Sequence, residues 1–223
     1  MLTKLSILFV TFTPLSCHLC HLNGTNNLQR FVTDKTTATM GKLSVFNFIS
    51  LDGYYKDANN GIDWHQHGQE EGEFSAKNLE YDSILLFGRI TYEMMASWWP
   101  SQNAIDLMPE IARGMNQAEK IVCTNTLQHT NWQNTRIMSD DIMAQIAELK
   151  KTSPKNITIL GSGKLSTQLA EAGLIDTYQI MIDPVAIGKG TSVFSGIQEH
   201  LNLKLSNTRS FKSGTVLLSY EAL

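Results

Sequence analysis

Residues 158–165 (Thr-Ile-Leu-Gly-Ser-Gly-Lys-Leu) constrain the fold most. An apolar strand pattern in this segment runs directly into a pair of glycines, and a helical pattern follows. Glycine allows a sharp backbone turn and lets a ligand approach the main chain closely. The first turn of the following helix has unpaired N–H groups and the positive end of the helix dipole. Together these features predict an anion site, most often for phosphate, where the strand meets the helix.

This glycine segment fits neither of two better-known phosphate motifs. Thr158 stands where a P-loop needs its first glycine, and Leu165 stands where it needs serine or threonine. Ser166 could complete a Rossmann fingerprint, but the segment lies late in the chain rather than on the first strand. A simple left-handed turn without a ligand therefore stays open as an alternative.

A second junction of the same kind lies at residues 87–93 (Phe-Gly-Arg-Ile-Thr-Tyr-Glu). It places Arg89 and the hydroxyl group of Thr91 in the first turn of a predicted helix. Because parallel strands point their carboxyl ends the same way, both junctions can line one crevice. The pair suits a ligand with two phosphate positions. The alternative for Arg89 is an ordinary solvated cation on a helix surface.

The composition narrows the class of protein. The chain has 223 residues, of which 42% are apolar and 17% charged, as in ordinary soluble globular proteins. Its formal net charge is −3 and it has no basic runs, so we expect no binding of nucleic acid. No stretch contains the roughly 18 apolar residues that a membrane span needs. We expect a cytoplasmic protein that binds a small molecule.

The first 39 residues differ in character from the rest. Lys4 and the apolar run after it resemble a weak signal peptide, and residues 17–21 (Cys-His-Leu-Cys-His) match the attachment motif of c-type haem. Zinc is another candidate ligand for these cysteines. We favour a simpler interpretation, in which residues 1–39 are a disordered leader or extension and residues 40–223 form one domain. Cys123, after an apolar run, is predicted to be a small buried side chain.

From Met40 onward, strand and helix patterns alternate. Strands are predicted at 43–49, 83–87, 120–123, 156–160 and 175–182, and a closing antiparallel pair at 201–205 and 216–220. Helices are predicted at 70–80, 89–98 and 105–115. A further helix is predicted after Ser139, which can cap it, with Ile142, Ile146 and Leu149 on one face. The last predicted helix runs from the glycine pair to Gly173, a C-terminal glycine cap. This order predicts an α/β fold with a mostly parallel sheet and an antiparallel C-terminal edge.

Several segments resemble one known superfamily. Residues 88–93 resemble the Gly-Arg-x-Thr-aromatic-Glu motif of dihydrofolate reductases, and residues 160–163 resemble their second glycine turn. The segments that resemble their next strand and the turn after it are 174–178 and 183–185. Residues 50–53 (Ser-Leu-Asp-Gly) and 62–64 are more similar to the reductase domain of riboflavin biosynthesis and its stand-alone bacterial relatives. The resemblance runs from about Lys42 to Tyr220 and implies a three-layer, dihydrofolate-reductase-like fold.

The resemblance also implies a cofactor and its contacts. The family carries a reduced nicotinamide dinucleotide, usually the 2′-phosphorylated form, NADPH. The positions that match its cofactor site are Gly88, Arg89, Thr91, Thr124, Asn125, Gly161, Ser162, Gly163 and Lys164. The positions that match its substrate site are Ser50, Asp52, Asp63 and Trp64. The flexible loop from 52 to 64 resembles the mobile loop that closes over the nicotinamide.

The catalytic acid is the point where the chain departs from the family pattern. Dihydrofolate reductases have a carboxylate four residues before a Phe on the first helix. Here Glu70 precedes Phe74 by four residues and Glu71 by three, without the surrounding Leu-Pro. Asp52 is the competing candidate, because the sister reductases have a matching Asp. The alternatives are a solvated helix face for the glutamates and a simple turn for Asp52.

We expect no metal site, since His65 and His67 have no third well-spaced ligand and are interpreted as solvated loop histidines.

The sequence, through this resemblance, predicts an NADPH-dependent reductase that acts on a small pyrimidine- or pterin-like substrate and forms a homodimer. The favoured type is 5-amino-6-(5-phosphoribosylamino)uracil reductase. Dihydrofolate reductase activity, a non-catalytic dinucleotide-binding module and an exported haem protein are the alternatives.

Overall fold

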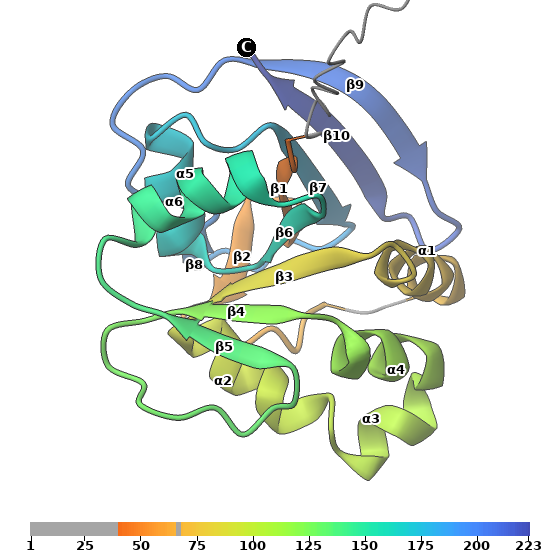
Figure 1. Cartoon of the computed structure of the whole chain (residues 1–223). Helices are drawn as coiled ribbons and strands as arrows, with labels where there is room; N and C mark the ends of the chain where they lie inside the picture. The colour runs from red at the N-terminus through yellow and green to blue at the C-terminus, as the bar shows by residue number, and fades with distance from the viewer. Residues whose placement is uncertain (1–39, 66–67) are drawn as a thin grey trace, which may run out of the picture. The chain divides into compact units, whose positions relative to one another are not determined.

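The computed structural model describes residues 40–65 and 68–223, so the predicted leader 1–39, its cysteine motif and His67 lie outside the described residues. An eight-stranded sheet has the order β5-β4-β3-β6-β1-β7-β10-β9, and β2 pairs with β8 separately (Figure 1). The strands are β1 Leu43–Ser50, β2 Tyr54–Asp57, β3 Ser83–Gly88, β4 Lys120–Cys123, β5 Thr135–Met138, β6 Asn156–Leu160, β7 Thr177–Asp183, β8 Gly190–Ser192, β9 Leu203–Ser210 and β10 Val216–Ala222.

The sheet is parallel from β5 to β7 and antiparallel at β10 and β9. This arrangement confirms the predicted α/β sheet with its antiparallel C-terminal edge. The apolar run from Ile84 to Phe87 forms β3, which lies between β4 and β6 and is buried on both faces. A strand covered by helices on both sides needs such a continuous apolar run.

Helices cover both faces of the sheet, which gives three layers (Figure 1). The helices are α1 Gln69–Leu79, α2 Arg89–Trp98, α3 Gln102–Leu107, α4 Pro109–Gln117, α5 Ile142–Thr152 and α6 Gly163–Glu171. Helices α5 and α6 pack on one face and α1 to α4 on the other. Within the described ranges, every helix is too short or too polar to span a bilayer.

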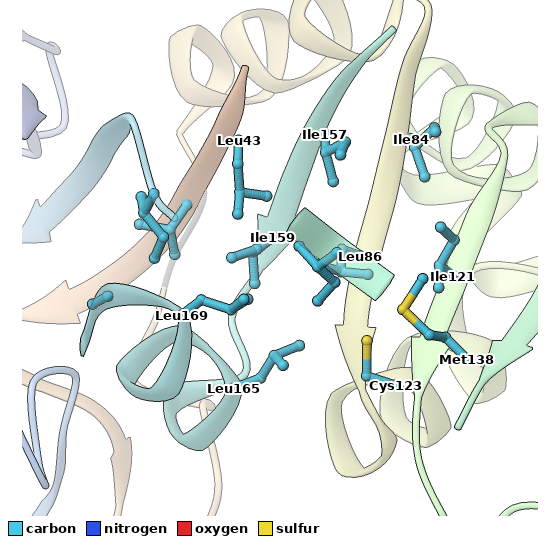
Figure 2. Close-up of a cluster of buried hydrophobic side chains, with 14 of the residues drawn as sticks. Leu43, Ile84, Leu86, Ile121, Cys123, Met138, Ile157, Ile159, Leu165 and Leu169 are labelled. Atoms are coloured by element: carbon cyan, nitrogen blue, oxygen red, sulfur yellow. The ribbon is translucent and has the colours of Figure 1, made fainter. Parts of the chain in front are cut away.

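The core beneath α5 and α6 consists of side chains from alternate strand positions (Figure 2). Leu43, Ile157 and Ile159 have no exposed surface, and Cys123 is buried as predicted. Burial raises the pKa of the Cys123 thiol to about 12, so this cysteine remains a neutral, unreactive packing group. Full burial of one such aliphatic side chain contributes roughly 1.5–3 kcal/mol.

The structure corrects several local expectations. The single helix predicted over 105–115 is two helices, because the residue before Pro109 is disfavoured in the helical conformation and Met108 adopts φ −139°. The N-cap of α5 is Asp141 rather than Ser139. Strands β2, β5 and β8 were not predicted, and β2 lies within the segment expected to be a flexible loop.

The buried ammonium group of Lys120 caps the C-terminal end of α4. Lys120, the first residue of β4, has no exposed surface. Its Nζ donates to the backbone carbonyls of Met115, Asn116 and Ala118 at 2.9, 3.1 and 2.6 Å, and lies 4.6 Å from the centroid of the Trp132 ring. The ammonium group thus caps the last turn and complements the negative end of the helix dipole.

Replacing Lys120 by methionine tests the cost of this buried charge. Burial lowers the pKa of Lys120 from 10.5 to about 8. Between these pH values the unfolded chain binds more protons than the folded one, so the folded wild type gains stability as the pH rises. We expect the unfolding free energy of the wild type, relative to that of Lys120→Met, to rise by up to about 3 kcal/mol across this window in urea denaturation. If the unfolding free energies of the wild type and Lys120→Met change in parallel with pH, the three carbonyls keep the Lys120 ammonium charged across this window.

Candidate active site

The two glycine junctions lie against each other at the carboxyl ends of β3 and β6, which are adjacent parallel strands. The backbone N–H of Gly88 donates to Oγ of Ser162 at 2.8 Å. A Cβ atom at Gly161 would lie only 3.3 Å from Cγ2 of Thr91. The crevice that the sequence predicted between the junctions is therefore held together by direct contacts.

Neither helix that starts in this crevice is capped by its own side chain. Gly161 and Ser162 both have left-handed backbones, with φ of 62° and 61°. Ser162 is the N-cap of α6, yet its Oγ bonds to Gly88 N–H and Leu160 O rather than to the first turn. The N-cap of α2 is Gly88, which has no side chain. The two N-termini therefore present unpaired backbone N–H groups side by side, and such groups are the chemistry that anion sites use.

Gly163 lines the cavity and also contacts Tyr55. A Cβ atom at this position would lie 2.7 Å from the hydroxyl oxygen of Tyr55 and 2.8 Å from the nearest ring carbon. The ring of Tyr55, on β2, thus packs directly on the start of α6. Burial there raises the pKa of Tyr55. A larger residue at 163 would have to displace this tyrosine.

A cavity of about 1330 Å³ extends from both junctions. Helices α1, α2 and α4 contribute to its walls, as do the first turns of α5 and α6 and the loop that carries Trp64 and His65. The strand residues on its floor include Ser44, Phe46, Thr158, Leu160, Thr177 and Gln179. Its volume exceeds the roughly 300–1,000 Å³ of ordinary ligand pockets, which suits a dinucleotide and a small substrate together.

Three buried polar atoms on the cavity wall have no hydrogen-bond partner among the described residues: Asn47 Nδ2, Trp64 Nε1 and Ser75 Oγ. Asn47 is only 3% exposed, and its Oδ1 lies 3.9 Å from the Cβ position of Gly161. A buried donor left unpaired costs roughly 1–3 kcal/mol. A ligand that accepts these hydrogen bonds would recover that free energy.

The predicted cofactor residues divide into two groups. The residues that line the cavity are Gly88, Arg89, Thr91, Asn125, Gly161, Ser162, Gly163 and Lys164. Arg89 Nη1 contacts both carboxylate oxygens of Glu93 at 2.9 Å, with both side chains nearly half exposed. Thr124 is buried, and its Oγ1 accepts from the N–H groups of the turn that follows.

None of the three candidate carboxylates lines the cavity. Asp52 accepts from Ser50 Oγ at 2.6 Å and from the N–H groups of Ile187 and Gly188 at 3.2 and 2.7 Å. The Ser50 hydroxyl, ahead of the two N–H groups, lowers the pKa of Asp52. The serine is itself fully buried and outside the cavity wall.

The two glutamates of α1 contact the β9–β10 turn instead. Glu70 pairs with Lys212 at 2.9 Å, which lowers the pKa of Glu70, and the buried Glu71 accepts from Ser213 Oγ. The face of α1 on the cavity carries Ser75, Asn78 and Leu79 and no carboxylate. The roles of Asp52, Glu70 and Glu71 in catalysis stay predictions, and each of them has a partner away from the cavity.

His65 is not a solvated loop histidine. Its Nδ1 bonds to Oδ2 of Asp183 at the end of β7, and the two side chains are 10% and 4% exposed. Its ring stacks on Phe48 with centroids 4.0 Å apart, and it lines the cavity beside Trp64. Asp63, its neighbour in the chain, is exposed and does not line the cavity. Sequence reasoning missed the pair because 118 residues separate its members. The described residues include no group of three or more potential metal ligands.

A model of the RibD C-terminal domain family matches residues 41–217. Uncharacterized protein YyaP of Bacillus subtilis (strain 168) is 30% identical over 172 residues, 77% of this chain and 90% of YyaP. A putative riboflavin biosynthesis protein from Shewanella sp. PV-4 has a similar structure, with TM-score 0.64, 20% identity and coverage of 82% of this chain and 99% of that one. Dihydrofolate reductase from Enterococcus faecalis, complexed with NADP(H), gives TM-score 0.57, 16% identity and coverage of 82% and 97%. The two structures confirm the dihydrofolate-reductase-like fold.

Gly163→Ala tests the packing of Tyr55 on α6. The added methyl group meets the tyrosine ring, so we expect the unfolding free energy to fall by about 1–3 kcal/mol in urea denaturation. Gly72→Ala in α1 is the matched control, because a Cβ there has no neighbour within 4 Å. That variant should instead gain roughly 0.5–1 kcal/mol. Equal gains in both variants would contradict the close contact between Tyr55 and Gly163.

Proposed function

This chain belongs to the RibD C-terminal domain family, and on that premise we propose that it is an NADPH-dependent reductase of a small pyrimidine- or pterin-like substrate. The favoured type is 5-amino-6-(5-phosphoribosylamino)uracil reductase. The observation that carries the proposal is the pair of uncapped helix N-termini joined by the Gly88–Ser162 hydrogen bond. When bound, the nicotinamide ring supplies the hydride; the protein binds and orients both reactants.

The cavity wall fits such a cofactor. The uncapped first turns of α2 and α6 offer backbone N–H groups to a pyrophosphate, and Asn47 Nδ2 beside Gly161 offers a further donor. Arg89 and Lys164 supply positive charge on the same wall. A phosphate group would compete with Glu93 for Arg89, and that exposed ion pair costs little to break. The Thr124–Asn125 turn remains our prediction for the adenosine 2′-phosphate.

The substrate half of the cavity has hydroxyl and amide groups. Ser75 Oγ, Trp64 Nε1 and the Gln179 amide lie on the wall or floor. Such groups match the donors and acceptors of a heterocyclic base. Lys42 and Lys56 are further cations on the cavity wall. The absence of a carboxylate on the cavity face of α1, among the described residues, disfavours dihydrofolate as the natural substrate, since a carboxylate holds an amino-pyrimidine edge by paired hydrogen bonds.

A non-catalytic dinucleotide-binding module is the second candidate. It is favoured by the same observation, that no predicted catalytic carboxylate lines the cavity. NADPH oxidation in the presence of 5-amino-6-(5-phosphoribosylamino)uracil, its dephosphorylated form or dihydrofolate separates the two. We expect turnover with one of the two uracils. Tight NADPH binding without turnover on any of the three supports the non-catalytic module.

The predicted homodimer and cytoplasmic location complete the proposal. Stand-alone relatives of this fold are often dimeric, which motivates the first, and the absence of a long apolar run motivates the second. Light scattering of the purified full chain measures the mass directly. A mass of twice 24.9 kDa supports the dimer, and 24.9 kDa contradicts it.

Arg89→Ala tests how the cofactor is held. Loss of a charge-assisted contact of roughly 1.5–3 kcal/mol should weaken NADPH binding by about 10- to 100-fold in calorimetric titration. If Arg89 binds the extra phosphate, NADH binding falls far less. Arg113→Ala is the control, because Arg113 also pairs with a glutamate on its own helix and lies off the cavity wall. Equal losses for the two cofactors would show that Arg89 does not contact the 2′-phosphate.

A further inference from the structure

We propose that His65 is the proton donor of the reduction and that Asp183 positions it. The inference rests on the proposed reductase function and adds the acid that the sequence pattern did not supply. It starts from one juxtaposition: a buried histidine–aspartate pair on the wall of the cavity that also receives both glycine junctions.

The His65–Asp183 pair lies at the carboxyl ends of the parallel strands, the same end of the sheet as the proposed cofactor site. Asp183 ends β7 and stands opposite Ser50, the last residue of β1, in the parallel register. Strand β1 lies between β7 and β6, and β6 leads into Gly161. Neighbouring strands are about 4.8 Å apart, and Asp183 lies three register positions, or about 10 Å, beyond the level of Gly161, so the two are roughly 14 Å apart. Both sites therefore face one crevice at the carboxyl ends of neighbouring strands.

The surroundings of His65 fix its ring. Oδ2 of Asp183 holds Nδ1, and Oδ1 of the same carboxylate accepts from Thr215 Oγ1 at 3.4 Å. Phe48 stacks on one side, and Trp64 stands edge-on with its centroid 6.0 Å away. A carboxylate on Nδ1 sets the tautomer and orientation of the imidazole and stabilises its protonated form. Nε2 is the other ring nitrogen and is buried at the cavity wall. In the proposal, this nitrogen exchanges the proton with the substrate.

The other ionisable side chains on the wall are placed less well for this role. Arg89 and Lys164 belong to the two helix starts, and Tyr55 is packed on Gly163. Lys42 precedes β1, at the opposite end of that strand from Ser50, and Lys56 Nζ donates to Asn60 Oδ1 at 2.7 Å. Tyr81 is largely exposed, and Cys123 is a buried neutral thiol. Asp140 and Asp141 precede α5, beyond the end of β5 at the other edge of the sheet. The three predicted carboxylates have partners outside the cavity. His65, by contrast, lines the cavity and packs its ring against Phe48 of β1.

In the proposed step, the carbon of a polar C=N or C=O bond in the substrate accepts hydride from the reduced nicotinamide. The π electron pair of that bond moves to the nitrogen or oxygen, which takes the proton from Nε2 of His65. The substrate gains two electrons and two hydrogens, and the dinucleotide loses a hydride and becomes oxidised. Solvent returns the proton to the imidazole before the next turnover.

His65→Gln and Asp183→Asn test the inference in the full chain. With 5-amino-6-(5-phosphoribosylamino)uracil and NADPH, we expect His65→Gln to lower kcat by about 100-fold or more, the usual range for general acid catalysis. Asp183→Asn should also lower kcat, and the double variant should fall no further than the worse single one. NADPH affinity in calorimetric titration should stay within about twofold of the wild type, which also shows that the variants fold.

A merely structural role for His65 would not produce two further results. The solvent deuterium isotope effect on kcat should disappear in His65→Gln, and added imidazole should restore part of the activity of His65→Ala. His200→Gln, at an exposed histidine, is the matched control and should leave kcat unchanged.

The outcomes separate this inference from the proposed function. If the wild type binds NADPH and reduces the uracil while His65→Gln keeps wild-type kcat, the inference is overturned and the reductase function stands. If the wild type reduces none of the substrates, the reductase function falls, and the inference with it. A large loss without imidazole rescue and with an unchanged isotope effect would assign His65 a structural role only.

Discussion

The hydrogen bond from Gly88 N–H to Ser162 Oγ joins the two strand–helix junctions on which the account of this protein depends. It forms only because Ser162 has a left-handed backbone, a conformation that costs a non-glycine residue roughly 1–2 kcal/mol. The same bond withdraws the serine side chain from the cap of α6. This interaction fixes the spacing of the two helix N-termini and leaves α6 without a side-chain cap, while α2 starts at Gly88, which has no side chain. We propose that a phosphate-bearing ligand binds to the unpaired N–H groups of both helices.

Different side chains line the two ends of the cavity. The end that we propose for the dinucleotide has cations and backbone N–H groups, and the end that we propose for the substrate has hydroxyls, amides and one histidine held by a buried carboxylate. The glutamates of α1 face the β9–β10 turn, so the helix that carries an acid in dihydrofolate reductases here presents Ser75 and Asn78. If the protein is a reductase, its proton comes from another element, and we propose His65, in the loop before α1, as the donor.

Local pattern predicted the elements whose sequence and burial agree. The run Ile84–Phe87 is apolar because β3 is covered on both faces, and Gly173 has φ of 64°, as its predicted place just after the last helical turn requires. The break between α3 and α4 was missed although Pro109 marked it. Strands β2 and β8 are four and three residues long and pair only with each other, too short for a periodic signal.

The site was predictable where its parts are contiguous and not where they are assembled from afar. Both glycine junctions are visible as strings of residues, and the structure brings them together. The His65–Asp183 pair and the packing of Tyr55 on Gly163 depend on tertiary structure, which no local pattern reveals. A crystal structure of the full chain with NADPH tests the central claim most directly. The account predicts the pyrophosphate against the first turns of α2 and α6, with the Gly88–Ser162 bond intact. A dinucleotide bound elsewhere, or no bound dinucleotide at saturating concentration, would contradict it.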